Sequence, residues 1–277
     1  MTFAVIATSV ILALFSAPLA AAVALPPTLV NIIDGMDDRA SLLDHGPTLG
    51  LSPAEIARIR QVSGHVACAG DQAVTGSGAL FLTNEQILTA GHIFFGPSGD
   101  LATKCFFRPQ TPNSHWLELD LTRAKFGATP PKPGSNNDWA VVRLKAPIAG
   151  AEPFPPASMP PAKGEALIVV TAQPAGFENL DPNVPVVQGC AVRRVPVSSG
   201  TTSFYRTDCD AGGGSSGGMH LARVDGKLVF RGMTISTGPW RDPKFVGAPY
   251  DEKAGSVTTA LGTDAAILAA GKSLAAP

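Results

Sequence analysis

The sequence predicts a mostly β protein that ends in a helix. Glycine and proline account for 29 and 25 of the 277 residues, which favours many short strands joined by turns. Short apolar or alternating runs bounded by turn residues recur from Gly64 onwards, whereas long amphipathic helical patterns are few. These observations place the chain in the all-β class.

The composition is that of a globular chain long enough for one large or two small domains. Hydrophobic residues make up 45% of the chain and charged residues 16%, with a formal net charge of −1 at pH 7. This balance argues against a nucleic acid or an anionic membrane surface as the partner.

The first 24 residues are apolar and uncharged, which is typical of a cleaved signal peptide. Ala-x-Ala cleavage sites end at Ala22 and at Ala24. An uncleaved membrane anchor is the alternative, but the stretch is only marginally long enough for one and Pro18 interrupts it. We therefore expect a secreted or periplasmic protein with no membrane attachment after cleavage.

The chain has four cysteines, all of which follow the export signal: Cys68, Cys105, Cys190 and Cys209. In an oxidising compartment two disulfides are the default, and three pairings are possible. A zinc site is disfavoured, because no Cys-x-x-Cys pair occurs and the five histidines are scattered.

Residues 25–61 are interpreted as a pro-segment or an N-terminal arm. Within this region the stretch 51–62 predicts a short helix, since Ser52 can cap its N-terminus and Pro53 suits its first position. The stretch before it is polar and irregular.

The remaining elements follow from local patterns. The clearest is a hairpin over 219–236, with Asp225 and Gly226 at its turn. A closing helix is expected over 263–275, with a capping threonine or aspartate at its start. The other predicted strands are 80–83, 86–89, 138–144 and 166–173.

Three short stretches contain candidate catalytic residues. They are TAGH, which ends at His92; NNDWAVVRL, in which Asp138 precedes an apolar strand; and GGSSGG, which contains Ser215 and Ser216. Taken alone, each has an ordinary structural interpretation: a loop histidine, a turn residue at a strand entry, and a flexible linker.

Together these residue types suit nucleophilic catalysis. A serine hydroxyl is a poor nucleophile until an imidazole accepts its proton, and the imidazole needs a buried carboxylate to fix its tautomer. The oxyanion that develops needs two backbone N–H donors aimed at one point, which glycines allow. His92, Asp138 and the glycine-rich loop could supply these parts.

With these motifs in the order His, Asp, Ser, the chain resembles the chymotrypsin-like (trypsin-fold) serine proteases, and most of all their bacterial secreted glutamyl-endopeptidase-like branch. The resemblance covers about residues 62–270. It implies two six-stranded antiparallel β-barrels with a C-terminal helix, in a protease domain over 62–277 whose barrels join near 150–165. The first barrel would supply the histidine and the aspartate, and the second the serine.

The resemblance also implies roles for individual residues. The family places its nucleophile directly before Gly-Gly, which selects Ser216 and makes Ser215 a neighbour. His92 would be the general base and Asp138 its orienting acid. The backbone N–H groups of Gly214 and Ser216 would form the oxyanion hole.

Disulfides and activation follow from the same resemblance. In the family one disulfide flanks the catalytic histidine, which matches Cys68–Cys105 and leaves Cys190–Cys209 as the second pair. Animal digestive proteases carry an aspartate directly before the nucleophile, which pairs with a freed N-terminus on activation. Ser215 stands at that position here, so this zymogen switch is expected to be absent. If the N-terminal region is a pro-segment, we place the cut within 58–63.

Three residues are candidates for the substrate pocket. Asp210 lies six residues before Ser216, where an acid at the pocket floor would select Arg or Lys; a loop-organising carboxylate is the equal alternative. Thr234 and Ser236 would stand in the pocket wall and hydrogen-bond substrate. His220, close to the nucleophile, is expected to be structural.

The sequence therefore predicts a secreted serine endopeptidase that cleaves polypeptides through an acyl-enzyme, as a monomer and without a metal or organic cofactor. A catalytically inactive trypsin-fold binding or adhesion module is the alternative. An esterase is disfavoured: residues 214–218 match Gly-x-Ser-x-Gly, but the α/β-hydrolase order is Ser, Asp, His.

Overall fold

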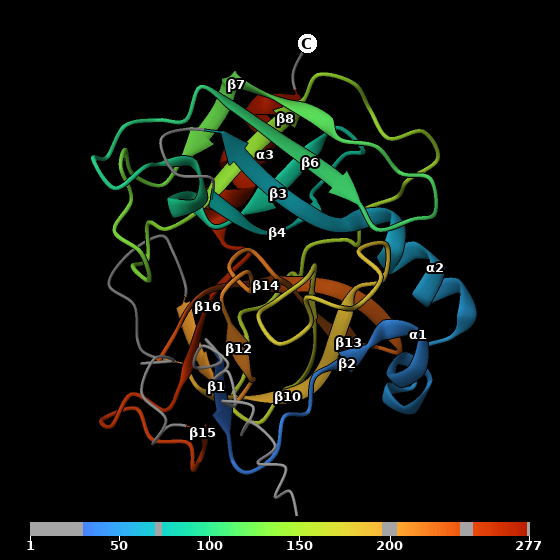
Figure 1. Cartoon of the computed structure of the whole chain (residues 1–277), viewed down its shortest axis with the longest axis vertical. Coiled ribbons are helices and arrows are strands. Elements are labelled where there is room, and N and C mark those ends of the chain that lie inside the picture. Colours follow the sequence, from blue (N-terminus) through green and yellow to red (C-terminus); the bar gives the residue numbers. More distant parts are fainter. Residues whose placement is uncertain (1–29, 70–73, 196–203, 239–245, 276–277) are drawn as a thin grey trace, which may run out of the picture.

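The computed structural model of the chain describes residues 30–69, 74–195, 204–238 and 246–275. Two β-barrels are stacked along the long axis, and the N-terminal part of the chain runs beside the second barrel (Figure 1). The predicted double barrel with a C-terminal helix is confirmed. The expected signal peptide lies outside the described residues.

The first barrel is closed by six strands in the order β3-β4-β5-β8-β7-β6, and all of its pairings are antiparallel. Apolar side chains that are fully buried fill it, Leu80 and Phe107 among the largest. Its strands are β3 (Ser63–Ala69), β4 (Val74–Leu80), β5 (Gln86–Thr89), β6 (Lys104–Pro109), β7 (Leu117–Phe126) and β8 (Ala140–Leu144).

The second barrel also has six strands, in the order β9-β10-β11-β16-β14-β13, and β10 closes it by pairing with both β9 and β11. The predicted hairpin is β13 and β14, whose turn residues Asp225 and Gly226 have φ of 49° and 76°, as a two-residue hairpin turn requires. The strands are β9 (Ala166–Thr171), β10 (Val186–Arg194), β11 (Phe204–Thr207), β13 (Met219–Val224), β14 (Lys227–Thr237) and β16 (Thr258–Gly262).

The segment before β3 packs on the second barrel and on the barrel junction. Strand β1 (Val30–Ile33) lies between β12 (Ala211–Gly212) and β15 (Val246–Ala248), and β2 (Ala40–Ser41) extends the second barrel by pairing with β10. Two short helices follow, α1 (Leu42–His45) and η1 (Gly46–Leu49). This stretch looked irregular in the sequence because its elements are only two to four residues long and depend on distant partners.

Helix α2 (Pro53–Val62) is the predicted helix, and its start is set by local chemistry. The Ser52 side chain accepts a hydrogen bond from the amide of Glu55, and the Glu55 carboxylate accepts one from the amide of Ser52. Ile59 and Val62 on its inner face are fully buried in the core cluster that spans both barrels.

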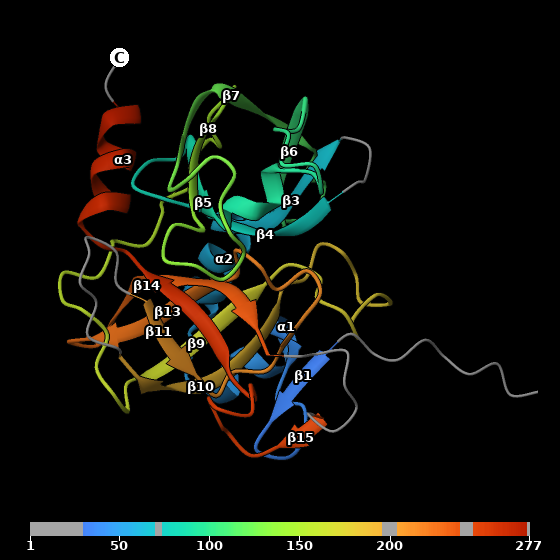
Figure 2. The ribbon, with the colours of Figure 1, turned by 90° about the vertical axis from the view of Figure 1, so that its left-hand side faces the viewer.

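The C-terminal helix α3 (Ala265–Ala275) leaves the second barrel and packs along the outside of the first (Figure 2). The Asp264 carboxylate accepts hydrogen bonds from the amides of Ala266 and Ile267, which caps the helix as predicted. Inside the helix, a Cβ at Gly271 would lie 2.6 Å from a methyl carbon of Leu82, so a glycine lets helix and barrel approach closely.

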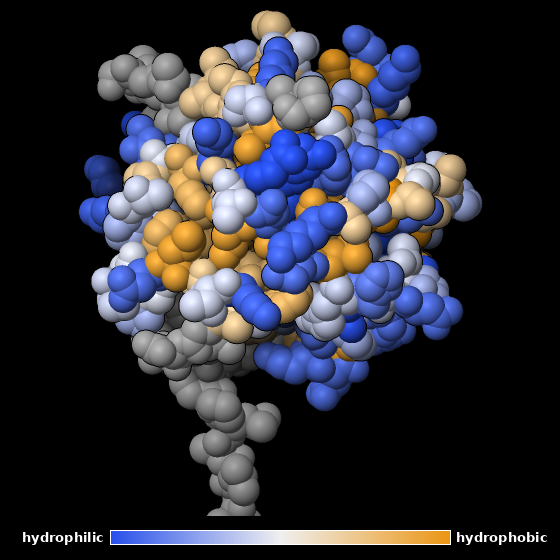
Figure 3. Space-filling model, turned by 90° about the horizontal axis from the view of Figure 1, so that it is seen from above, coloured by the Kyte–Doolittle hydropathy of each residue, from blue (hydrophilic) through white to orange (hydrophobic). Residues whose placement is uncertain are grey.

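The barrels share one hydrophobic core cluster, in which the rings of Phe81 and Phe230 meet edge to face at 5.8 Å. This contact holds the ends of the two barrels together. Seen from the end of the first barrel, the surface shows polar and apolar residues interspersed (Figure 3).

Candidate active site

A cleft of about 250 Å³ lies where the two barrels meet. His92, which reaches it from the first barrel, faces residues of the second barrel across the opening. The residues that line the cleft are His92, Pro133, Ala211, Gly212, Gly213, Ser215, Ser216, Thr234, Ile235, Ser236 and Thr237.

The pairing of strands β5 and β8 brings His92 and Asp138 together. Thr89, the last residue of β5, pairs with Ala140, the first of β8, so the residues just beyond these ends are neighbours. One Asp138 carboxylate oxygen accepts the backbone amide of His92 at 2.9 Å, and the other lies 2.8 Å from His92 Nδ1. The second oxygen also accepts the amide of Gly134 at 2.7 Å.

This geometry fixes the state of the imidazole. Asp138 is fully buried, whereas the side chain of His92 is 22% exposed toward the cleft. A buried carboxylate holds the proton on Nδ1, which leaves Nε2 free as an acceptor.

Hydrogen bonds within the loop help to hold the turn around Ser216. The Ser215 hydroxyl accepts the amide of Gly212 at 3.1 Å, and the Ser215 carbonyl accepts the amide of Gly218 at 2.9 Å. Gly214 and Gly217 have φ of 85° and 80°, a region that favours glycine. The glycines therefore shape a tight turn rather than a flexible linker.

Both expected oxyanion donors are available. The Gly213 carbonyl accepts the amide of Ala175 at 2.7 Å, and because a trans peptide points its C=O and N–H in opposite directions, the N–H of Gly214 is aimed away from Ala175. Neither this N–H nor that of Ser216 donates to any residue that the structure describes. An oxyanion that develops at Ser216 would need two free N–H donors of this kind.

The Ser216 hydroxyl makes no hydrogen bond with any described residue, His92 included. Ser216 and His92 nevertheless line the same cleft. Catalytic hydrogen bonds are often long in the absence of substrate and shorten in the complex.

Comparison with known proteins decides the family. Residues 76–229 match the trypsin-like peptidase domain, which is more than half of the chain. The chain belongs to the trypsin-like peptidase family. The serine endopeptidase class expected from the sequence is thereby confirmed. Among curated proteins, none matches the chain in sequence.

Solved structures of several proteases share the fold of this trypsin-like peptidase. A Glu endopeptidase in complex with MPD is 15% identical, with a TM-score of 0.61 over 89% of this chain and 100% of the other. A thermostable serine protease from an extremophilic microorganism is 15% identical, with a TM-score of 0.58 over 79% and 100%. The active form of the protease Rv3671c from M. tuberculosis is 14% identical, with a TM-score of 0.55 over 96% and 95%.

In this trypsin-like peptidase, Asp210 does not line the cleft, contrary to the pocket-floor hypothesis. Its carboxylate is 2.8 Å from the amide of Ile33 and 2.9 Å from that of Asp38, and it accepts a hydrogen bond from each. Burial raises the pKa of Asp210 to about 6. The carboxylate organises the N-terminal segment, which is the alternative that the sequence left open.

Thr234 and Ser236 line the cleft as expected, and a buried hydrogen-bond chain stands behind Thr234. His220 Nε2 lies 2.8 Å from Thr234 Oγ1, and His220 Nδ1 lies 2.9 Å from the hydroxyl oxygen of Tyr205. Complete burial lowers the pKa of His220 to about 3, so its ring is neutral at pH 7. His220 is structural, as expected, but it also orients a residue of the cleft.

Sequence reasoning missed the contribution of β1 to the site. Asn31, which is fully buried, donates a hydrogen bond to the Thr237 hydroxyl in the cleft wall at 3.0 Å. Val30 pairs with Gly212, at the start of the nucleophile loop. No local pattern marks such residues, because their partners lie far along the chain.

The disulfides of the structure are Cys68–Cys105 and Cys190–Cys209. Cys68 and Cys105 face each other in the register of β3 and β6, and Cys209 is next to Asp210. The second bond therefore links β10 to the segment that leads into the nucleophile loop.

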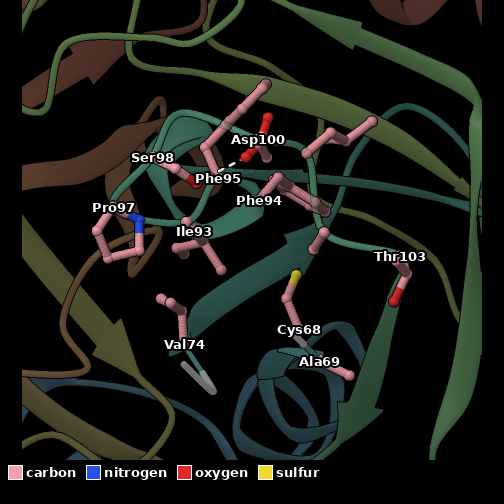
Figure 4. A pocket seen from close by; sticks show the side chains of 13 residues that line it. Cys68, Ala69, Val74, Ile93, Phe94, Phe95, Pro97, Ser98, Asp100 and Thr103 are labelled. Atoms are coloured by element: carbon pink, nitrogen blue, oxygen red, sulfur yellow. Dashed lines mark hydrogen bonds between the residues drawn. The ribbon is translucent and has the colours of Figure 1, made fainter. Parts of the chain in front are cut away.

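A second hollow, of about 190 Å³, lies on the outer side of helix η2 (Gly91–Phe94). Ile93 and Val74 are among its apolar lining, and the Ser98 hydroxyl donates to Asp100 at its rim (Figure 4). No helix among the described residues is long and apolar enough to cross a membrane.

Proposed function

We propose that this trypsin-like peptidase is an exported endopeptidase whose nucleophile is Ser216. The observation that carries the proposal is the His92–Asp138 pair, which faces Ser216 across the cleft with a buried carboxylate on Nδ1. His92 Nε2 takes the hydroxyl proton as Ser216 attacks the peptide carbonyl carbon. The same nitrogen then gives that proton to the leaving amine, and an acyl-enzyme remains.

Water completes the cycle. His92 accepts a proton from the water that attacks the acyl carbonyl, and the ester bond to Ser216 breaks with return of the proton to the serine oxygen. In both halves the N–H groups of Gly214 and Ser216 stabilise the oxyanion. Removal of one such donor is expected to cost about 3 kcal/mol of transition-state stabilisation.

The cleft wall offers hydroxyl groups to the substrate. Burial raises the pKa of Tyr205 well above 10, so its hydroxyl keeps its proton. His220 Nδ1 is the one hydrogen-bond partner of this buried hydroxyl among the described residues, so we infer that Tyr205 donates to it. His220 then donates from Nε2 to Thr234, which leaves the Thr234 hydroxyl hydrogen for a substrate acceptor. With Asp210 engaged elsewhere, we infer a preference for side chains that accept hydrogen bonds rather than for Arg or Lys.

Labelling with a fluorophosphonate probe tests the nucleophile, because such a probe reacts only with an activated serine. We expect labelling of the wild type and its complete loss in Ser216→Ala. Ser273→Ala, which removes an exposed hydroxyl on α3, is the matched control and should label like the wild type. A wild type that is neither labelled nor able to cleave casein would favour the inactive binding module.

Export is supported by the apolar N-terminus and the two disulfides. We propose that residues 25–61 stay in the mature protein, since Leu42 and Ile59 are completely buried in the shared core. Mass spectrometry of the active exported protein should therefore find an N-terminus at Val23 or Leu25. An active form that begins within 58–63 would show instead that the segment is a removable pro-segment.

A further inference from the structure

Ser77, on strand β4, has every polar group engaged at the junction of the two barrels. Its side chain is buried, and β4 lies on the side of the first barrel that faces the second (Figure 2). The Ser77 hydroxyl donates to the Gly214 carbonyl at 2.8 Å and accepts the amide of Ala172 at 2.9 Å. Its backbone amide donates to the Ser216 carbonyl at 2.7 Å.

Ser77 supplies two of the four hydrogen bonds that the carbonyls of residues 213 to 216 accept. Four successive carbonyls, those of residues 213 to 216, each accept one hydrogen bond. The donors are, in order, the Ala175 amide, the Ser77 hydroxyl, the Gly218 amide and the Ser77 amide. Because a peptide unit is planar, a fixed carbonyl fixes the N–H of the next residue. Ser77 therefore fixes the 214–215 and 216–217 peptide units, which lie on either side of the unit that carries the Ser216 N–H.

Ser77 is also tied to the strand that leads to His92. The Thr89 hydroxyl, three residues before His92, donates to the Ser77 carbonyl at 2.6 Å. The approach is close, since a Cβ at Gly217 would lie 2.0 Å from that carbonyl oxygen and 2.2 Å from the Thr89 hydroxyl oxygen. One residue thus connects the histidine strand of the first barrel with the serine loop of the second.

We propose that Ser77 is a positioning residue that holds Ser216 and the peptide units flanking its N–H in place against His92; this rests on the function proposed above. Its hydroxyl touches neither substrate nor a reacting atom. Without the Ser77 hydroxyl, the buried Gly214 carbonyl and Ala172 amide have no hydrogen-bond partner. The loop can then move out of the productive arrangement. Small displacements of such groups are costly for the transition state and much less so for substrate binding.

The test compares Ser77→Ala with Ser63→Ala. Ser63 is equally buried on the first barrel and also donates to a carbonyl, that of Ile59, away from the cleft. We expect Ser77→Ala to lower kcat for a peptide substrate about 10- to 100-fold with KM within a factor of three, and to slow fluorophosphonate labelling equally. Ser63→Ala should keep the wild-type kcat, and Ser77→Thr, which retains the hydroxyl, should restore most of it.

Three results would overturn the proposal. They are a wild-type kcat in Ser77→Ala, an equal fall of kcat in Ser63→Ala, and a change in Ser77→Ala that raises KM but leaves kcat unchanged. If Ser77→Ala does not fold, Ser77→Cys replaces it, with a smaller loss of kcat expected because a thiol is a weaker donor. An unlabelled wild type would refute the proposed function alone. Hydrogen exchange of residues 212–218 then decides the inference, which requires faster exchange in Ser77→Ala than in Ser63→Ala.

Discussion

Asp138→Asn is expected to lower kcat by about 10⁴-fold while leaving the fold intact. The two carboxylate oxygens of Asp138 accept three N–H groups: the backbone amide and Nδ1 of His92 and the amide of Gly134. An asparagine has only one oxygen, so its NH₂ group must oppose a donor in either orientation. One orientation forces the proton from Nδ1 to Nε2, and the other disrupts the turn that carries His92.

The pH dependence of the residual activity shows whether Asp138→Asn has lost its general base or its fold. With the wrong tautomer, the residual activity of Asp138→Asn should rise with hydroxide concentration, because the imidazole no longer takes the serine proton efficiently. Kinetics between pH 6 and 10 measure this, with circular dichroism to check the fold. Asp44→Asn, at an exposed position of α1, is the matched control and should retain full activity. A loss below tenfold in Asp138→Asn would mean that Asp138 is not the orienting acid.

Elements that the chain specifies locally were predictable from the sequence. The turn at Asp225 and Gly226 needs two residues with positive φ, and the capping box of Ser52 and Glu55 closes within four residues. His92 and Asp138 could be selected as candidates because each lies just beyond a strand end, in a short motif that suits catalysis. Their contact required one further fact, the pairing of β5 with β8.

The parts that could not be predicted depend on distant partners. Strand β1 has four residues and gains its hydrogen bonds from β12 and β15, about 180 and 215 positions later in the chain. Asp210 is the clearest consequence, because the sequence offered a pocket acid and a loop organiser on equal terms. The hydrogen bonds that its carboxylate accepts from the amides of Ile33 and Asp38 favour the loop organiser, and only the fold brings these amides close.

The same dependence on distance explains why Ser77 was overlooked. In the sequence it is a small residue between two glycines of a strand, with nothing to mark it. Its partners, Gly214 and Ala172, belong to the other barrel. Motifs describe the groups that react, whereas the residues that position those groups are found through contacts between elements.

His220 is expected to make the stability of the fold depend on acid. Burial lowers its pKa from 6.5 to about 3 in the folded state, while the unfolded chain protonates it at its ordinary pKa. The unfolded state therefore binds more protons below pH 6.5, and the stabilising effect of the neutral ring is lost as the pH falls from 6.5 toward 3. Between pH 7 and pH 4 this amounts to about 3 kcal/mol of unfolding free energy.

Urea denaturation at pH 7 and pH 4 measures the effect, in a Ser216→Ala background that prevents self-digestion. Other groups titrate in this range too: Asp210, whose raised pKa opposes the trend, and His65, whose lowered pKa adds to it. They are common to all variants, so the comparison isolates His220. Between pH 7 and pH 4, the free energy of unfolding of His220→Gln should fall by about 3 kcal/mol less than that of its parent. His115→Gln, which changes an exposed histidine, is the control and should behave like the parent. An identical loss in His220→Gln and its parent would mean that burial does not lower the pKa of His220 in the folded protein.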